Sequence, residues 1–436
     1  MLNWINDILW KWMLPLALLA TAILCGIEMK FKPIRSFYRI IIDAVRAMRS
    51  KESFPSSKSL SQKQMFSTAL AASLGTGNLI GTAAALLTGG AGAIFWMWIS
   101  AFVGMILVYA ENLLSSRFRR KCVASDMGGA LLYLPDPRLS AVFAAACAAV
   151  GIFMGSMAQA SAIAVSAAKF SVPPVVSTVA TCLLCALILS GDAGKIGAVS
   201  SRVVPMICLM YFVGCGVILA RYFGSIPAVF ARIFREAFGF RSITGGFCAS
   251  ALISSIGIGF RRGIFSNEAG LGSSGLLHMH GDASDDEMQA NSSVLEVFFD
   301  TVVCCTLTAL TILSVPSHHL DFSDSASLLL SAFTCGLGRF AAPFLAICMI
   351  LFAFATMIGW YPCGAAAFRF LFPHSDLYYL AFYILAGVIA CRIDANLIFP
   401  LCDFCNACMA LPNLYGLCAM RKHLKTTYHR EERTFL

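Results

Sequence analysis

The chain contains the run AASLGTGNLIG at residues 71–81 and the run RGIFSNEAGLGS at residues 262–273. Each run places glycine and polar residues inside a stretch that is otherwise apolar enough to cross a membrane as one helix. Inside hydrocarbon each unpaired N–H or C=O group costs several kcal/mol, so a broken span survives only beside a buried site or a polar cavity. The two runs therefore predict helix breaks, at residues 75–78 and 264–273, and indicate where the functional site lies.

The composition around these runs is that of a membrane protein. Of 436 residues, 58% are hydrophobic and 13% are charged, and the mean hydropathy is +0.78. A soluble protein carries roughly 25% charged residues. The 32 Lys and Arg residues are concentrated between the apolar segments, so the net charge of +9 reflects membrane topology rather than affinity for nucleic acid. We expect no nucleic-acid partner.

About 11 apolar stretches approach the roughly 20-residue length that a membrane-spanning helix needs, which predicts an all-α integral membrane protein. The predicted spans are 12–27, 65–88, 93–114, 140–168, 173–190, 203–220, 244–277, 293–315, 340–361, 377–391 and 395–418. Without the first span, the other ten divide into two sets of five, and each set opens with a broken helix. Matched breaks of this kind are typical of an inverted repeat whose broken helices meet near the bilayer midplane.

This division predicts five parts of the chain. They are an extra transmembrane helix with a basic cytoplasmic segment (1–64), a first five-helix repeat (65–221), an extracellular loop (222–243), a second five-helix repeat (244–418) and a cytoplasmic basic tail (419–436).

The positions of the cations predict the orientation in the cell membrane, because Lys and Arg accumulate in cytoplasmic loops. The dense basic segment 30–63, the cluster 117–121 and the tail then lie in the cytoplasm, with the amino terminus outside and the carboxyl terminus inside. Two stretches fit less well. Four arginines would face outward and the acidic stretch 282–287 would face inward; the arginines are Arg221, Arg232, Arg235 and Arg241.

Two broken helices that meet can bind a zwitterion. A free helix amino end attracts a carboxylate, and exposed carbonyl groups attract an ammonium group or a cation. An amino acid carries both groups, and sodium needs only carbonyl and hydroxyl oxygens. One pair of breaks can therefore hold the carboxylate of an amino acid on free N–H groups and its ammonium group on carbonyl groups.

The quoted runs resemble the alanine/glycine:cation symporter (AGCS) family of prokaryotes. Further matches are GGAGAIFWMW at 89–98, Asp300-Thr301 and LPNL at 411–414, and the resemblance extends from about residue 10 to about residue 415. It implies sodium-coupled uptake of a small neutral amino acid such as alanine or glycine. It also implies the leucine-transporter (LeuT) type of fold of the APC superfamily, a 5+5 inverted repeat with two discontinuous helices preceded by one extra helix.

The resemblance also assigns residues to the site. The residues implied to contact the substrate lie on the two broken helices and on the third and eighth core helices: Thr76, Gly77, Asn78, Gln159, Phe265, Ser266, Asn267, Thr356, Met357 and Trp360. The residues implied to bind the sodium ion are Gly75, Thr76, Asn78 and Thr356. A bulky Met357 and Trp360 favour small substrates.

Some residues depart from the family pattern and leave the substrate open. Ser156 and Ser161 stand where the family has Asn. A usual Tyr-Tyr-Gly-Glu run after Trp360 is replaced at three positions, and two prolines are replaced by alanine; the residues concerned are Pro362, Cys363, Ala365, Ala91 and Ala130.

Ionisable residues within spans are candidates for gating or structural roles, because a charge in a membrane is costly. They are Glu111, Arg262, Glu268 and Asp300. Glu268 is expected to cap a half-helix or to pair with Arg261 or Arg262. Glu111, Glu296 and Asp300 are expected near helix ends.

Rival interpretations are weaker. A channel needs polar residues along several spans, whereas here they cluster at the breaks. An enzyme needs a catalytic constellation, whereas the seven histidines are expected in loops or in the tail. His278, His280 and Asp282 are expected in a solvated loop rather than at a metal. Cys402, Cys405 and Cys408 read as a packing stripe rather than cluster ligands.

The sequence thus predicts a secondary active symporter in a bilayer, with sodium as coupling ion, no other metal or cofactor, no catalytic residue and no obligatory protein partner. The alternative is a proton-coupled or facilitative transporter of another small zwitterion.

Overall fold

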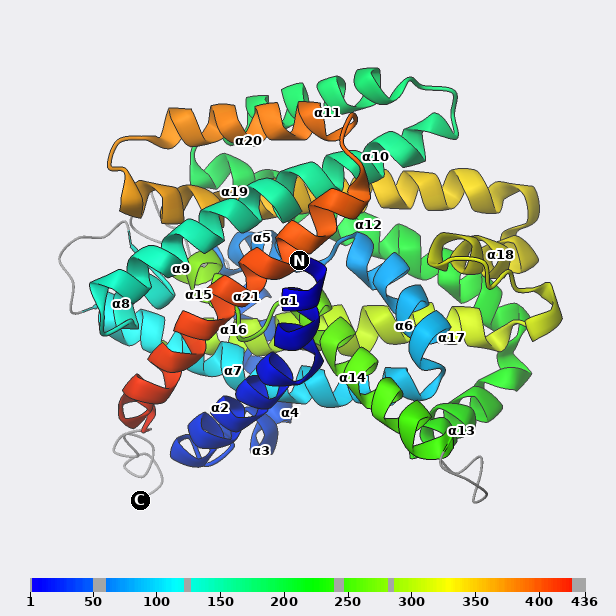
Figure 1. The fold of residues 1–436 in the computed structure, drawn as a ribbon, viewed down its shortest axis with the longest axis horizontal. Helices are drawn as coiled ribbons and strands as arrows, with labels where there is room; N and C mark the ends of the chain where they lie inside the picture. Colours follow the sequence, from blue (N-terminus) through cyan, green and yellow to red (C-terminus); the bar gives the residue numbers. More distant parts are fainter. Residues whose placement is uncertain (1, 50–59, 121–126, 239–246, 281–285, 426–436) are drawn as a thin grey trace.

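The computed structural model describes residues 2–49, 60–120, 127–238, 247–280 and 286–425 (Figure 1). These described residues are helical, with no strand among them, which confirms the predicted all-α class. Parts of five predicted features lie outside the described residues: the middle of the basic segment 30–63, Lys121 of the cluster 117–121, the junction of the loop 222–243 with the span 244–277 (including Arg241), most of the acidic stretch 282–287, and the end of the tail.

The first half of the chain runs from α1 to the long helix α12. Its elements are α1 (Leu2–Ile8), η1 (Leu9–Met13), α2 (Leu14–Glu28), α3 (Lys32–Arg35), α4 (Phe37–Arg49), α5 (Gln62–Ser73), η2 (Gly77–Gly81), α6 (Thr82–Gly89), α7 (Gly92–Arg119), α8 (Ala130–Tyr133), α9 (Pro137–Val150), η3 (Gly151–Ala158), α10 (Gln159–Ala168), α11 (Pro174–Leu189) and α12 (Ala193–Arg221).

The second half contains the other broken helix. Its elements are η4 (Phe223–Ser225), α13 (Ile226–Ala237), α14 (Phe247–Asn267), α15 (Ser273–Leu277), η5 (His278–His280), α16 (Asp286–Val297), η6 (Phe298–Cys305), α17 (Thr306–Ser314), η7 (Ser317–His319), α18 (Ser325–Leu337), η8 (Gly338–Phe340), α19 (Ala341–Leu371), α20 (Asp376–Ala390), α21 (Ala395–Met420) and η9 (Arg421–Leu424).

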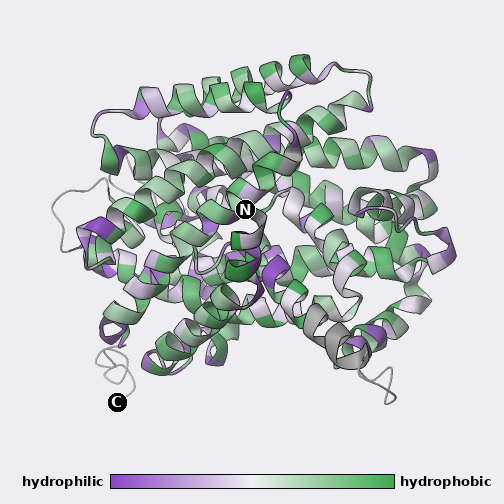
Figure 2. Ribbon diagram, viewed as in Figure 1, coloured by the Kyte–Doolittle hydropathy of each residue, from purple (hydrophilic) through white to green (hydrophobic). Residues whose placement is uncertain are grey.

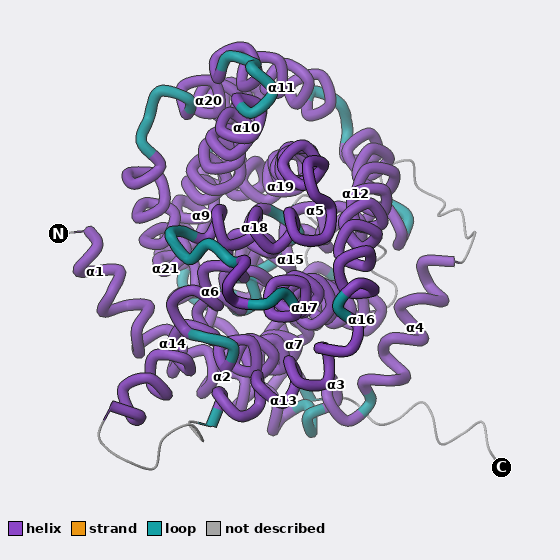
Figure 3. The backbone as a smooth tube through the Cα atoms, turned by 90° about the vertical axis from the view of Figure 1, so that its right-hand side faces the viewer, coloured by secondary structure: helices purple, strands orange, loops and turns teal. Residues whose placement is uncertain are grey.

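Most of the long helices run across the molecule from one end to the other in Figure 1, and Figure 3 looks along several of them. Hydrophobic residues cover much of their length, and many hydrophilic ones lie at the turns (Figure 2). By length and hydropathy, seven of the described helices could cross a membrane, or eight if the bent pair α5 and η2–α6 is one span. The chain is therefore a multi-pass membrane protein, and the larger count of about 11 spans stays a prediction.

Acidic residues neutralise the basic segments at one end of the bundle. Lys32 Nζ lies 2.6 Å from Glu287 Oε2, and Arg117 and Arg120 both pair with Asp286. Arg421, after α21, pairs with Glu28 at the end of α2. We call this the basic end. The part of the acidic stretch that the structure describes thus lies beside the basic segments, so it does not oppose the orientation that the cations predict.

At the opposite end, α13 neutralises one of the arginines that the charge rule did not explain. Arg232 Nε lies 2.7 Å from Glu236 Oε1, and Glu236 Oε2 accepts a hydrogen bond from Ala91 N at 2.9 Å. A Cβ atom at Gly92 would lie 2.6 Å from Ala237 N, so α13 packs directly on the start of α7.

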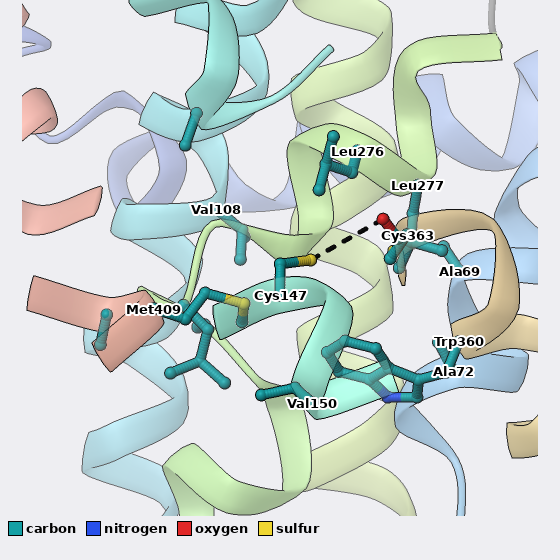
Figure 4. Packing of buried hydrophobic residues seen from close by; sticks show 14 of the residues in the cluster. Ala69, Ala72, Val108, Cys147, Val150, Leu276, Leu277, Trp360, Cys363 and Met409 are labelled. Carbon is teal, nitrogen blue, oxygen red and sulfur yellow. Dashed lines mark hydrogen bonds between the residues drawn. The ribbon is translucent and has the colours of Figure 1, made fainter. Parts of the chain in front are cut away.

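Close helix packing positions α19 against α5. A Cβ atom at Gly359 would lie only 2.4 Å from Ala72 N, so glycine is what allows this crossing. Figure 4 shows the neighbouring core, where Cys147 Sγ contacts Cys363 O at 3.8 Å beside Trp360. The cysteines of the described residues are free, as expected for small apolar residues, and no metal-binding group of His, Cys, Asp and Glu occurs among these residues.

We predict that Gly359→Ala destabilises the protein. The added methyl group would meet backbone of α5, which cannot rotate away, and overpacking of this kind costs about 1–3 kcal/mol. The thermal unfolding midpoint in detergent should fall. Gly216→Ala, in α12 with nothing within 4 Å of its added Cβ, is the matched control and should leave the midpoint unchanged or slightly raised. Equal midpoints for the two variants would contradict the crossing.

Candidate functional site

The first predicted break is present. A capping box of Ser61 and Gln64 starts α5, the helix ends at Ser73, and the two halves of the bent pair differ in direction by 52°. Within the break Gly77 is exposed, and a Cβ atom there would meet nothing within 4 Å. A Cβ at Gly75 would instead lie 2.8 Å from Thr356 Oγ1. One side of the break thus faces open space while the other packs on α19.

The second predicted break is also present, but it is shorter than predicted. Three residues between α14 and α15 have left-handed backbone: Glu268, Gly270 and Gly272, with φ of 54°, 83° and 85°. The prediction began the break at Ile264. The structure corrects this, because Glu268 N still donates to Ile264 O at 2.8 Å, which keeps Phe265, Ser266 and Asn267 in the last turn of α14.

A buried carboxylate joins the two broken helices. Asp300, in the π-helical segment η6, has no exposed surface. Its Oδ1 accepts a hydrogen bond from Asn78 Nδ2 at 2.7 Å, and its Oδ2 accepts from Ser266 Oγ at 2.6 Å and from Thr301 Oγ1 at 2.9 Å. Asn78 follows the first break and Ser266 precedes the second. Asp300 therefore fixes the distance between the breaks.

Two asparagines extend this network into the unwound backbone. Asn78 Oδ1 accepts a hydrogen bond from Gly75 N at 3.0 Å, so a side chain of the first break replaces the helical acceptor that Gly75 N lacks. Asn267 Oδ1 accepts from Ala269 N at 3.1 Å, and Asn267 Nδ2 donates to Thr301 Oγ1 at 3.1 Å. The side chains of Asn78 and Asn267 thus hydrogen bond both to backbone N–H groups of the breaks and to the side chains of Asp300 and Thr301.

Three residues implied to contact the substrate lie on α19 beside both breaks: Thr356, Met357 and Trp360. Thr356 Oγ1 lies 3.2 Å from Leu74 O, a carbonyl of the first break. Trp360 Nε1 donates to Glu268 Oε1 at 2.9 Å, at the second break. Met357 and Trp360 are fully buried. The α19 helix therefore holds the two breaks on a common face.

Two other predicted residues, Gln159 and Phe265, have partners outside the Asp300 network. Gln159 donates to Met154 O at 3.1 Å, and its buried Oε1 has no hydrogen-bond partner within the described part of the chain. Phe265 packs on Trp10 of the extra helix with ring centroids 4.4 Å apart, and the Arg261 guanidinium lies 5.6 Å from the centroid of the Phe265 ring. Arg261 also pairs with Asp403 at 3.0 Å. These contacts cover the last turns of α14.

The ionisable candidates differ from the expectations. Glu268 forms no ion pair with Arg261 or Arg262 among the described residues, and its partner is Trp360. Glu111 and Asp300 lie within membrane helices rather than near helix ends. Glu111 is fully buried and its Oε1 accepts from Asn413 Nδ2 at 2.8 Å. A carboxylate inside a span can pair with a neighbouring amide, so a cationic partner is not required.

His278 is not in a solvated loop as predicted. It is 3% exposed, and its Nδ1 lies 2.9 Å from Ser274 O. Sequence reasoning also gave no role to Thr301 and Asn413. Asn413 Nδ2 donates to Gly270 O at 3.0 Å in the second break. The only signal for these two residues was their place in the matching motifs Asp300-Thr301 and 411–414.

Three π-helical segments carry or directly precede site residues. They are η2 after the first break, η3 immediately before Gln159, and η6 with Asp300 and Thr301. Such segments are rare, and they are frequent at functional sites because they free backbone groups from the regular pattern. This clustering supports a ligand site among these helices.

A cavity of about 380 Å³ lies toward the basic end, between α5, α15, α19, α20 and the turn that joins α11 to α12. Thr68, Leu277 and Tyr361 contribute to its walls, and Arg369 pairs with Asp376 at 2.8 Å on its lining. Two of the departures from the family pattern, Pro362 and Ala365, also line it.

Comparisons with known proteins show the family of the chain and its fold. The profile of the Sodium:alanine symporter family matches residues 1–433. The sodium/alanine symporter AgcS of Methanococcus maripaludis is 32% identical over 96% of this chain and 93% of its own. The probable sodium/glutamine symporter GlnT of Bacillus subtilis is 29% identical over 96% and 87%. A mutant form of the manganese transporter of Eremococcus coleocola shares the fold with a TM-score of 0.50 and 15% identity, over 87% of this chain and 79% of its own.

We predict that Asp300→Asn lowers the free energy of unfolding by about 3 kcal/mol. Asn78 Nδ2 and Ser266 Oγ now donate to the carboxylate, and the NH₂ group of the new asparagine could not accept a hydrogen bond from either. Thermal unfolding in detergent should show a markedly lower midpoint. The matched control is Asp376→Asn, which alters an exposed ion pair with Arg369 and should change the midpoint little. An Asp300→Asn protein as stable as this control would exclude the carboxylate as a tie between the breaks.

Proposed function

Because the chain belongs to the sodium:alanine symporter family and is a transporter rather than an enzyme, we propose that it imports a small neutral amino acid together with sodium by alternating access. The observation that supports this most directly is the pair of helix breaks tied together by Asp300. Two unwound segments held at a fixed distance provide main-chain donors and acceptors for one small solute.

The proposed substrate lies between the amino end of η2 and the carbonyl end of α14. Thr76 and Gly77 begin the helical segment after the first break, where the first N–H groups have no acceptor within the helix and attract a carboxylate. The last carbonyl groups of α14, at Phe265 and Ser266, attract an ammonium group. Met357 and Trp360 limit the side chain. Alanine and glycine fit these constraints.

The proposed sodium ion binds where α19 meets the first break. Leu74 O and Thr356 Oγ1 lie 3.2 Å apart there, and both are the neutral oxygens that sodium accepts. The break supplies further backbone carbonyls at Gly75 and Thr76. Bound sodium would stabilise the unwound conformation of α5–η2 and so raise the affinity for the amino acid, and the amino acid would raise the affinity for sodium by the same factor.

We also propose the inverted-repeat arrangement and the orientation that the sequence predicts. The basic end would face the cytoplasm of a prokaryotic cell, with the amino terminus outside, because Lys and Arg accumulate on that side. The cavity at the basic end then adjoins the path to the cytoplasm.

Uptake of labelled substrates into proteoliposomes tests the proposed function. Alanine, glycine, serine and glutamine would each be offered with an inward sodium gradient, with an inward proton gradient, and with neither. We expect saturable accumulation of alanine or glycine that needs sodium. Accumulation driven by the proton gradient alone would favour the proton-coupled alternative, and linear, gradient-independent flux would contradict symport.

We predict that Thr356→Val raises the sodium concentration for half-maximal uptake by about tenfold, the effect of losing roughly 1.4 kcal/mol of binding free energy. Valine keeps the shape and removes the oxygen beside Leu74 O. Thr334→Val, on α18, removes an exposed hydroxyl that also bonds within its helix, and it should leave the sodium dependence unchanged. Unaltered sodium dependence in Thr356→Val would remove this hydroxyl from the ion site.

A further inference from the structure

Glu296 and His278 form a buried pair that has no part in the proposed substrate and sodium sites. Glu296 lies on α16 and is 5% exposed, and His278 lies in η5 and is 3% exposed. Glu296 Oε2 and His278 Nε2 are 3.9 Å apart. Neither atom has a hydrogen-bond partner among the described residues. Two buried polar atoms thus face each other, and no other described group satisfies them.

The partners of the histidine determine where a proton must be. His278 Nδ1 lies 2.9 Å from Ser274 O, and a carbonyl oxygen only accepts, so Nδ1 carries a hydrogen. In the neutral ring Nε2 is then an acceptor, and an ionised Glu296 also offers only acceptors. Without a further proton, two lone pairs would face each other in a buried site. One proton on either atom turns this contact into a donor–acceptor pair.

The pair lies between the basic-end halves of both broken helices. His278 directly follows α15, the half of the second broken helix at the basic end. Helix α16, which carries Glu296, packs on α5, and α5 also packs on α15 and on η5, which carries His278. A change in the packing of α5 against α15 therefore changes the distance between Glu296 and His278.

The surroundings of the pair favour a bound proton. Three further carboxyl groups on nearby elements are buried: Glu111 of α7, Asp300 of η6 and Glu268 of the second break. The charged side chains that the neighbouring helices α4 and α5 contribute are exposed; they are Arg39, Asp43, Arg46 and Lys63. Burial disfavours an ionised carboxylate at Glu296 unless a positive charge on His278 compensates it.

We propose that Glu296 and His278 together bind one proton in this conformation, and that this proton holds the basic-end halves of the two broken helices together. Loss of the proton weakens their contact and eases their separation. The effect on transport rests on the proposed function, whereas the binding of the proton does not.

The pH dependence of stability tests the proton directly. In Glu296→Gln the amide can donate to His278 Nε2, and in His278→Gln the amide can donate to Glu296 Oε2, so neither variant needs the proton. Thermal unfolding in detergent would be followed from pH about 5 to about 9, the range around the histidine titration. The control is Glu287→Gln, the same substitution at the surface of α16.

We expect the midpoint of the wild type and of Glu287→Gln to fall with rising pH by about 2 °C or more per unit once the proton leaves, and that of Glu296→Gln to fall less. The sign follows because a proton bound more tightly in the folded state stabilises at low pH and is lost as pH rises. If Glu296→Gln follows the control, the pair holds no proton and the proposal is wrong. If Glu296→Gln does not fold, His278→Gln decides by the same criterion.

Uptake measurements distinguish a failure of this proposal from a failure of the proposed function. In proteoliposomes with a sodium gradient, the wild-type rate should depend on pH, and the rate of Glu296→Gln should depend on it less than that of Glu287→Gln. If the wild type accumulates no amino acid at any pH, the proposed function is wrong, and the stability profiles still determine whether the pair binds a proton. Equal pH dependence in all variants would exclude a role of the proton in transport.

Discussion

The hydrogen bonds of one buried carboxylate, Asp300, are the constraint on which the rest of the site depends. Unwound backbone in a membrane protein is stable only where its polar groups are satisfied. Asp300 satisfies Asn78 after one break and Ser266 before the other, and Asn78 in turn holds Gly75 N. The breaks therefore exist as a pair. A solute site between them needs no additional charged residue, because helix ends already supply partial charges of both signs.

Side chains on the long helices around the breaks hydrogen bond to polar groups of the break residues. Thr356 reaches the first break from α19, Trp360 reaches the second from the same helix, and Asn413 reaches the second from α21. All three come from the second half of the chain. Movement of α19 against α5 would change contacts at both breaks at once, which is the kind of two-state element that coupling between an ion and a solute requires.

The sequence was sufficient to locate the two breaks, because clustered glycine and asparagine weaken a helix that hydrocarbon would otherwise keep fully hydrogen-bonded. It could not place the ends of the breaks. Ser266 and Asn267 look like break residues by composition, yet the bond from Glu268 N to Ile264 O keeps them helical. The hydrogen-bond partners of the break residues were harder to predict than the ends of the breaks. Glu268 has arginines nearby in sequence, but it bonds to Trp360, 92 positions away. The role of Asn78 as a tie to Asp300 depends on such distant contacts, which periodicity does not report.

Four of the departures from the family pattern, three on α19 and one on η3, lie outside the hydrogen bonds of Asp300. Pro362 and Ala365 line the cavity toward the basic end, Cys363 contacts Ser273 O, and Ser156 donates to Tyr383 O at 2.6 Å. None of these residues is among those that tie the breaks to Asp300. Substitutions there alter the packing of α19 against its neighbours and the walls of the cavity, while the backbone that we propose to bind the amino acid keeps its geometry. Differences in substrate range within such a framework would then arise from the walls rather than from the main-chain contacts.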